Sequence, residues 1–212
     1  MPLKERNNAV VPGCGRVVYF SVGVHDSNAL ATAITDTVQQ FGGPVNALIN
    51  NAGLALGAPA CFQDQSIGDI SMMVGTNASG VLFAAHAALN QGGMFAQKRG
   101  VIVNVTSVTA LEAPPFSGEA VYYMAKATQE GFSNSLRNEL CGTNIKVVVV
   151  RSGVVVTNFH EQRPLVSEDI ADAISWVLEK PECVMVKAID VVPTAQRSLS
   201  LFDREWSARN AK

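Results

Sequence analysis

Short apolar runs alternate along the chain with longer stretches in which apolar residues recur at helical spacing. The short runs are rich in β-branched and aromatic residues, a composition typical of buried strands. We predict strands at Arg16–Val22, Val45–Asn50, Gly100–Thr106, Ile145–Arg151 and Val184–Val192. The longer stretches predict helices at Ser27–Phe41, Ser66–Leu89, Val121–Leu140 and Ser167–Leu178, with Asp26 or Ser27 placed to cap the first of them.

The order of these elements indicates the fold class. Strands that are apolar on both faces and alternate with helices favour a parallel sheet covered by helices on both sides. We therefore predict a doubly wound, Rossmann-like α/β domain over residues 1–195, followed by a C-terminal tail over residues 196–212. No internal repeat interrupts this pattern.

Composition and charge narrow the classes of function. The chain has 212 residues and a formal net charge of -2, so it offers no large basic surface for nucleic acid. Its three histidines lack metal-ligand spacing and its four cysteines form no CxxC pair, which predicts neither a metal site nor a disulfide framework. No apolar run approaches the roughly 18 residues that span a bilayer, and the start does not resemble a signal peptide. We expect a soluble, cytoplasmic protein without a membrane segment.

In a parallel sheet, ligands bind beyond the carboxyl ends of the strands, so polar residues there are the first candidates for a site. Four segments qualify: Asn50–Gly53, Thr106–Ser107, Tyr122–Lys126, and Ser152–Gly153 together with Thr157.

Tyr122 and Lys126 are four residues apart on a predicted helix, which places their side chains on one face. A neighbouring ammonium group favours the phenolate, so we expect Lys126 to lower the pKa of Tyr122 and make it a general acid-base. Ser107, at the end of a strand, could donate a hydrogen bond to the oxygen that receives the proton. These groups suit carbonyl reduction or alcohol oxidation. An amphipathic helix with a snorkelling lysine would show the same spacing.

An ordered set of motifs resembles the short-chain dehydrogenase/reductase family over about Gly15 to Ala195. The motifs are LINNAGLAL (Leu48–Leu56), Asn77, NVTS (Asn104–Ser107), YYMAK (Tyr122–Lys126) and SGVVVTNF (Ser152–Phe159). The chain is most similar to NADP-dependent 3-hydroxy acid and serine 3-dehydrogenases. That narrower resemblance lies in EGFSNSLRNEL (Glu130–Leu140), SEDIADAISWVLEKP (Ser167–Pro181) and VPTAQRS (Val192–Ser198).

The resemblance implies four catalytic residues. Tyr122 would be the proton donor, and Lys126 would hold the nicotinamide ribose. Ser107 would orient the substrate carbonyl, and Asn77 would order a water behind Lys126. The implied reaction transfers a hydride between NADP(H) and a small hydroxy acid, alcohol or ketone.

The resemblance also implies how the cofactor is bound, with NADP expected and NAD possible. Asn50, Ala52 and Gly53 would border its adenosine and ribose, together with Tyr122 and Lys126 at the nicotinamide end. The backbone from Gly153 to Val155 and the Thr157 hydroxyl would contact the carboxamide and phosphates. Turn and helix hydrogen bonding is the alternative role for the NNAG residues and Asn77. A homodimer or homotetramer, joined by the two longest helices, is implied as well.

The sequence departs from the family at its start. The glycine-rich TGxxxGxG turn is absent, since Gly13 and Gly15 precede a strand, and Arg16–Val22 aligns with the family's third strand. A chain truncated in this way leaves Val45–Asn50 with an unpaired side. Arg16–Val22 could then pair with it directly, or the first 45 residues could be loosely held.

Three smaller departures lie nearer the site. Gly23 stands where the family usually has an aspartate beside the adenine, and Ser152 stands where it has proline. The loop between Ser107 and Tyr122 is longer than usual, which makes Thr109 a rival for the serine role.

Two hypotheses follow. The first is an NADP-dependent oxidoreductase with its catalytic residues in place. The second is a non-catalytic subunit or interaction protein of the same ancestry. The missing phosphate loop predicts weak or absent activity in this chain.

Overall fold

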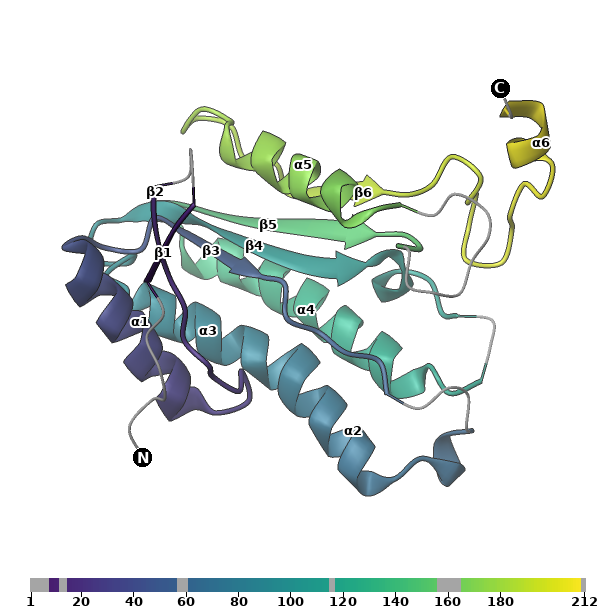
Figure 1. Ribbon diagram of the computed structural model, residues 1–212, viewed down its shortest axis with the longest axis horizontal. Coiled ribbons are helices and arrows are strands. Elements are labelled where there is room, and N and C mark those ends of the chain that lie inside the picture. Colours follow the sequence, from purple (N-terminus) through teal and green to yellow (C-terminus); the bar gives the residue numbers. More distant parts are fainter. Residues whose placement is uncertain (1–7, 12–14, 57–60, 115–116, 156–164, 211–212) are drawn as a thin grey trace.

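A computed structural model describes residues 8–11, 15–56, 61–114, 117–155 and 165–210. Its centre is a parallel sheet with the strand order β3-β4-β5-β6. The strands span Ala47–Asn50 (β3), Arg99–Ser107 (β4), Asn144–Ser152 (β5) and Ala188–Val191 (β6). Because all four run in one direction, their carboxyl ends lie along one edge (Figure 1).

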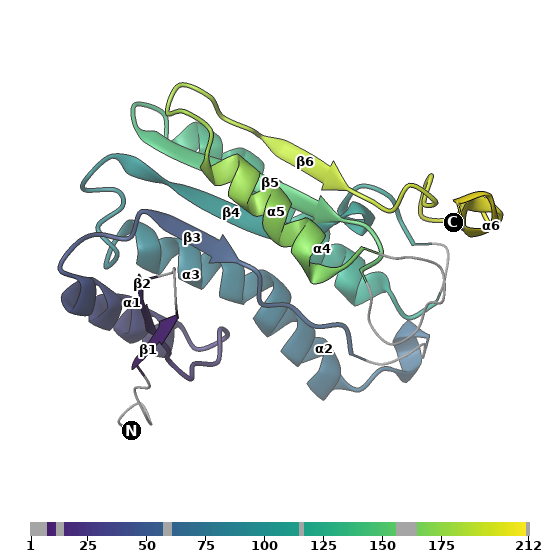
Figure 2. The ribbon, with the colours of Figure 1, turned by 45° about the horizontal axis from the view of Figure 1, so that its top comes forward.

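Helices cover both faces of the sheet, which confirms the predicted fold class (Figures 1 and 2). Ile102 and Val147 point to the face that packs on α3 (Gly80–Leu89) and α4 (Ala120–Glu139). The alternate residues Val103 and Val148 point to the face that packs on α5 (Ser167–Leu178). All four side chains are fully buried. The two-residue period of a strand thus divides the valine-rich runs between two cores.

The helical stretch before β4 is one continuous rod with a change of winding in its middle. It consists of α2 (Ile67–Val74), a π-helical turn over Gly75–Ser79 that we call the π-turn, and α3. The rod is long and apolar enough to cross a membrane by length and composition, contrary to the expectation that no such run exists. Within its most apolar window 56% is buried inside the protein, and it contacts α1 and α4. We therefore assign it to the core.

Small residues along this rod serve packing inside the chain. Six of them are buried in the monomer: Ala78, Gly80, Ala84, Ala85, Ala87 and Ala88. A Cβ added to Gly80 would lie 3.0 Å from the Val24 side chain, in the segment that leads into α1. These positions are occupied by intramolecular contacts and do not form a free surface.

The N-terminal region stands apart from the sheet. β1 (Asn8–Val11) and β2 (Gly15–Val18) form an antiparallel hairpin, followed by α1 (Ser27–Phe41). The strand predicted at Arg16–Val22 is shorter than expected and pairs with β1, so the direct pairing with Val45–Asn50 is not formed. As a result, β3 ends the sheet among the described residues, and its Ile49 side chain is 43% exposed.

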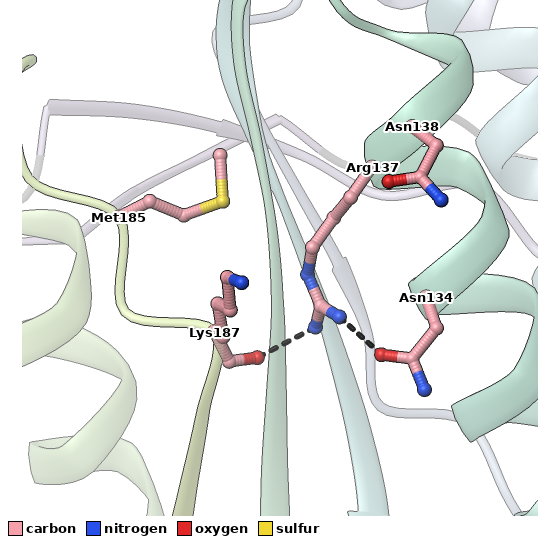
Figure 3. A pocket seen from close by; sticks show the side chains of 5 residues that line it. All are labelled: Asn134, Arg137, Asn138, Met185 and Lys187. Atoms are coloured by element: carbon pink, nitrogen blue, oxygen red, sulfur yellow. Dashed lines mark hydrogen bonds between the residues drawn. The ribbon is translucent and has the colours of Figure 1, made fainter.

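Polar side chains fasten the opposite edge of the sheet. Figure 3 shows Arg137 of α4 beside a pocket, with its guanidinium directed at Lys187 and Asn134. Arg137 donates to the carbonyl oxygens of Val147 (2.8 Å) and Lys187 (2.6 Å), and also to the Asn134 side chain. These donors join α4, β5 and the segment leading into β6.

The C-terminal tail folds back on itself. Gln196 forms an antiparallel bridge with Phe202, and the backbone N–H of Asp203 donates to the carbonyl of Ala195. Ala195, Gln196 and Leu199 are buried. A short helix, α6 (Trp206–Asn210), follows beyond the carboxyl ends of the strands (Figures 1 and 2).

Candidate active site

Ser107 and Tyr122 face each other across the carboxyl edge of the sheet. Ser107 is the last residue of β4, and its hydroxyl oxygen accepts a hydrogen bond from the Thr109 backbone N–H at 3.2 Å. That contact leaves the hydroxyl proton available for donation. Tyr122 lies in the first turn of α4, close enough to Ser107 for that side chain to lower the pKa of its phenol. The structure therefore brings together two groups that the sequence places 15 residues apart.

The pKa of Tyr122 is higher than its usual value, and burial is the largest cause. The interaction with Ser107 lowers the pKa, while the carboxylate of Glu119 raises it further. The expectation of a lowered pKa for Tyr122 is wrong for this state of the protein, because burial raises it overall. The Lys126 ammonium lies 5.7 Å from the centre of the Tyr122 ring, and desolvation of the phenol is the larger effect.

Lys126 is almost fully buried one turn further along α4. Its ammonium donates to the Val105 carbonyl oxygen at 3.1 Å. Because burial disfavours the charged form, the pKa of Lys126 falls to about 8. A Cβ built on Gly53 would lie 3.7 Å from the Lys126 nitrogen. The absence of a side chain at Gly53 therefore leaves space beside a cation with donors to spare.

Asn77 lies in the π-turn and is fully buried. Its side-chain oxygen accepts from the Leu54 backbone N–H at 2.9 Å, and its side-chain nitrogen donates to the Leu54 carbonyl at 2.6 Å. Asn77 thus binds both the backbone N–H and the backbone carbonyl of Leu54, the residue after Gly53. A π-helical turn of this kind is frequent at functional sites.

The NNAG residues divide into a buried and an exposed part. The Asn50 side chain is buried, and its nitrogen donates to the Asn104 side chain at 2.8 Å. Ala52 and Gly53 are exposed in the loop that follows β3. The first residue of the motif therefore fastens β3 to β4, and the later ones form the border of the site.

The segment after β5 is held by a residue that sequence reasoning missed. The Gln196 side-chain oxygen accepts from the Val154 backbone N–H at 3.0 Å, between the predicted contacts Gly153 and Val155. A Cβ on Gly153 would lie 2.5 Å from that same oxygen, so a larger residue there would have to displace the Gln196 side chain. Gln196 belongs to the VPTAQRS motif, which was the available signal. Thr157 lies outside the described residues.

An ion network lies one turn below Lys126. Arg151 of β5 contacts Glu130 of α4 at 2.7 Å and Asp190 of β6 at 2.7 Å. Its guanidinium binds both carboxylate oxygens of Glu130, whose side chain is 10% exposed. This network ties α4 to two strands beneath the site. Glu130 belongs to the EGFSNSLRNEL motif, but the motif did not indicate its partners Arg151 and Asp190.

These residues fit the nicotinamide and ribose end of a dinucleotide better than its pyrophosphate end. At the nicotinamide and ribose end, hydrogen-bond donors come from Lys126 and from the Gly153–Val155 backbone. Gly53 allows a ligand to approach closely there. Pyrophosphate groups bind where an uncapped helix N-terminus follows a glycine-rich turn. The N-terminus of α1 is instead capped by the carboxylate of Asp26, which accepts from two backbone N–H groups at 3.0 Å. An anionic cap disfavours a second anion at that place.

Comparisons with known proteins show the family to which this chain belongs. Residues 3–165 match the family model for short chain dehydrogenases. The chain is 30% identical to serine 3-dehydrogenase of Agrobacterium fabrum over 91% of this chain and 81% of that protein. It is 33% identical to sulfoacetaldehyde reductase 2 of Chromohalobacter salexigens, covering 85% and 76% of the two chains.

Two solved structures extend the comparison. The closed form of a serine dehydrogenase complexed with NADP+ is similar with a TM-score of 0.77 and 26% identity, covering 86% of this chain and 78% of that one. Serine dehydrogenase from Escherichia coli is similar with a TM-score of 0.73 and 28% identity, covering 84% and 76%.

Proposed function

Because this chain belongs to the short chain dehydrogenase family of oxidoreductases, we propose that it transfers a hydride between NADP(H) and a small hydroxy acid, alcohol or ketone. The observation that carries the proposal is the convergence of Ser107, Tyr122 and Lys126 at the carboxyl edge of the sheet. Relatives named as serine 3-dehydrogenase and as NADP-dependent 3-hydroxy acid dehydrogenase support this substrate class and NADP, with NAD as the second candidate.

The proposed proton transfer follows from the hydrogen-bonding capacity of these groups. In the reductive direction, the Tyr122 phenol gives its proton to the carbonyl oxygen of the substrate. The Ser107 hydroxyl, whose oxygen already accepts from Thr109, donates to the same oxygen and stabilises its developing charge. In the oxidative direction, the Tyr122 phenolate takes the proton back. Bound NADP(H) supplies or accepts the hydride.

Lys126 has two roles in the proposal. Its ammonium would hold the ribose of the cofactor, and the absence of a side chain at Gly53 leaves space beside it. The ammonium also stabilises the Tyr122 phenolate when the proton has left, because an opposite charge favours the ionised form. Asn77 keeps the neighbouring Leu54 peptide in place, in addition to its implied role in ordering a water.

The remaining proposed cofactor contacts are Asn50, Ala52, Gly53, Gly153, Val155 and Thr157. Asn50 acts from within the sheet, since its amide is bound to Asn104. Because no TGxxxGxG turn occurs in this sequence to bind the pyrophosphate, we expect weak affinity for NADP(H).

A titration of the purified chain with NADPH, followed by cofactor fluorescence, tests the proposal. We expect weak but saturable binding, and reduction of small 3-oxo acids, aldehydes or ketones that depends on NADPH. Tyr122→Phe should lower turnover by about 10²- to 10⁴-fold and leave cofactor affinity nearly unchanged. No saturable binding at millimolar NADPH would overturn the enzymatic proposal in favour of a non-catalytic subunit, a role that the comparisons do not support.

The cellular setting forms the remainder of the proposal. The three described cysteines, Cys61, Cys141 and Cys183, are exposed free thiols, which suits the reducing cytoplasm.

We propose a homodimer or homotetramer in solution. Light scattering on the purified chain measures the mass, and a monomer at micromolar concentration would contradict the proposed assembly.

A further inference from the structure

A line of buried hydrogen bonds runs through the protein beneath the candidate site. The Asn50 side chain donates to the Asn104 side chain (2.8 Å), which donates to the Ser133 hydroxyl (2.8 Å). Ser133 in turn donates to the backbone carbonyl of Gln129 at 2.6 Å. The line thus begins in β3, crosses β4 and enters α4 at Ser133, two turns beyond Lys126.

The Gln129 side chain carries the line out of α4. Its nitrogen donates to the backbone carbonyl of Asn77, in the π-turn, at 2.5 Å. The Asn77 side chain then binds the backbone N–H and the backbone carbonyl of Leu54. The line therefore returns to the loop that begins at Asn50, and Gln129 is its only described side-chain link between α4 and the π-turn.

Packing alone does not explain why a glutamine occupies position 129, as its side-chain oxygen indicates. Gln129 is 1% exposed, and its side-chain oxygen is buried with no hydrogen-bond partner among the described residues. An unpaired buried oxygen lowers stability, and an apolar side chain of the same length would avoid that cost. The useful group of Gln129 is therefore the nitrogen that holds Asn77.

We infer that Gln129 is a positioning residue for the cofactor-contacting loop Ala52–Leu54, acting through the π-turn and the Asn77 side chain. This inference rests on the proposed function for its effect on NADP(H). No hydrogen bond among the described residues joins Gln129 to Ser107 or Tyr122. Its loss should thus weaken cofactor binding and leave proton transfer intact.

Gln129→Met tests the inference because methionine keeps the length of the side chain and removes both polar atoms. Losing about one hydrogen bond's free energy should speed amide hydrogen exchange at Leu54 about five- to tenfold and raise the Kd for NADPH by a similar factor. The kcat at saturating NADPH should stay within about twofold, because substrate-oxygen contacts remain in place.

Gln97→Met is the matched control. Gln97 also donates its side-chain nitrogen to a backbone carbonyl, that of Val45 at 3.2 Å, at the other end of the sheet. Gln97→Met should leave unchanged both the amide hydrogen exchange at Leu54 and the Kd for NADPH. If Gln129→Met does not fold, Gln129→Asn provides the test, since its shorter amide stays polar and no longer reaches Asn77.

The two readouts separate failure of the inference from failure of the proposed function. Unchanged exchange at Leu54 in both Gln129 variants overturns the inference, whatever the chain does with NADPH. Faster exchange in a chain that never binds NADPH supports the coupling and overturns the proposed function. Faster exchange with an unchanged Kd overturns the claim that the loop positions the cofactor.

Discussion

The two sides of the candidate site are built differently. The catalytic side rests on β4, β5 and α4, where Val103 and Val148 are fully buried and Arg151 joins three elements. The cofactor side rests on β3, a strand of four residues with one neighbouring strand in the part of the chain that the structure describes, and on the exposed loop that follows it. The hairpin β1–β2 lies apart from the sheet and adds no strand to it.

The two sides differ in the interactions that hold their residues in place. On the catalytic side, packing on both faces of the sheet and paired charges act together, so several independent interactions fix the position of each residue. Residues of the cofactor side depend on a few hydrogen bonds, namely two from Asn77 to Leu54 and one from Val154 to Gln196. Proton-transfer geometry should therefore tolerate perturbation better than cofactor affinity does.

Arg151→Met should produce the largest loss of stability. The substitution leaves the Glu130 carboxylate nearly buried without its partner, and breaking a buried pair costs about 3–5 kcal/mol. Urea unfolding monitored by circular dichroism measures the change. A loss below about 1 kcal/mol would show that water replaces the partner and that the catalytic side is less firmly built than its contacts indicate.

A pair of isoleucine truncations compares the two sides directly. Ile102→Ala, in the covered middle of β4, should cost about 2–5 kcal/mol because it leaves a cavity. Ile49→Ala, on the open edge of β3, should cost less than about 1 kcal/mol since the side chain is 43% exposed. Equal losses in denaturant unfolding would contradict the comparison.

Gly153→Ala should destabilise the junction between the sheet and the tail. The new Cβ would lie 2.5 Å from the Gln196 side-chain oxygen and 3.1 Å from the Val192 backbone, so the tail must move. Overpacking of this kind costs about 1–3 kcal/mol. Limited proteolysis should cut the tail faster in this variant. Gly43→Ala serves as the control, because a Cβ there meets nothing within 4 Å.

Lys126 should make stability depend on alkaline pH. Its folded pKa of about 8 lies below the value of 10.5 for a free lysine, so the unfolded chain binds more protons between these two values. Stability should therefore rise as the pH increases from 8 toward 10, by about 1–3 kcal/mol. The raised pKa of Tyr122 opposes this only above pH 10, where the unfolded phenol ionises first.

Lys126→Met should abolish that rise and be more stable than the parent chain near neutral pH, while losing turnover. Urea unfolding from pH 7 to pH 10 measures the slope, with the exposed Lys187→Met as the control. A slope that persists in Lys126→Met would assign the effect to another group.

Gly53→Ala should have the smallest effect on folding and a clear effect on the cofactor side. The added Cβ would meet the Asn77 oxygen at 3.5 Å and the Lys126 nitrogen at 3.7 Å, both ordinary contact distances. Stability should change by less than about 0.5 kcal/mol. NADPH affinity should fall several-fold, because the methyl group occupies space beside Lys126. Unchanged affinity would place the cofactor elsewhere.

Local patterns predicted the regular elements well. α1 and α5 match their predicted ranges, and the strands at Gly100–Thr106 and Ile145–Arg151 lie within β4 and β5. In these segments, capping, periodicity and burial all favour the same structure. The predicted strand Val184–Val192 is reduced to β6, because only Ala188–Val191 has a neighbouring strand to pair with.

Contacts between distant segments were not predictable in the same way. Pairing of β2 with β1 depends on which edges are available, and no local pattern records that. The π-turn inserts one extra residue into an otherwise regular helical stretch, so hydrophobic periodicity alone did not reveal it. Gln129 and Gln196 act through side-chain contacts with segments 52 and 42 residues away, and only the fold brings these together.

The open edge of β3 also bears on how the protein behaves when concentrated. A row of backbone donors and acceptors faces outward from this strand beside an exposed isoleucine, and such rows recruit strands from other molecules. Partial unfolding of α1 and the hairpin would make the edge of β3 more accessible to other molecules. We expect aggregates rich in intermolecular β-structure to nucleate there, and a lysine placed at Ile49 to slow their growth.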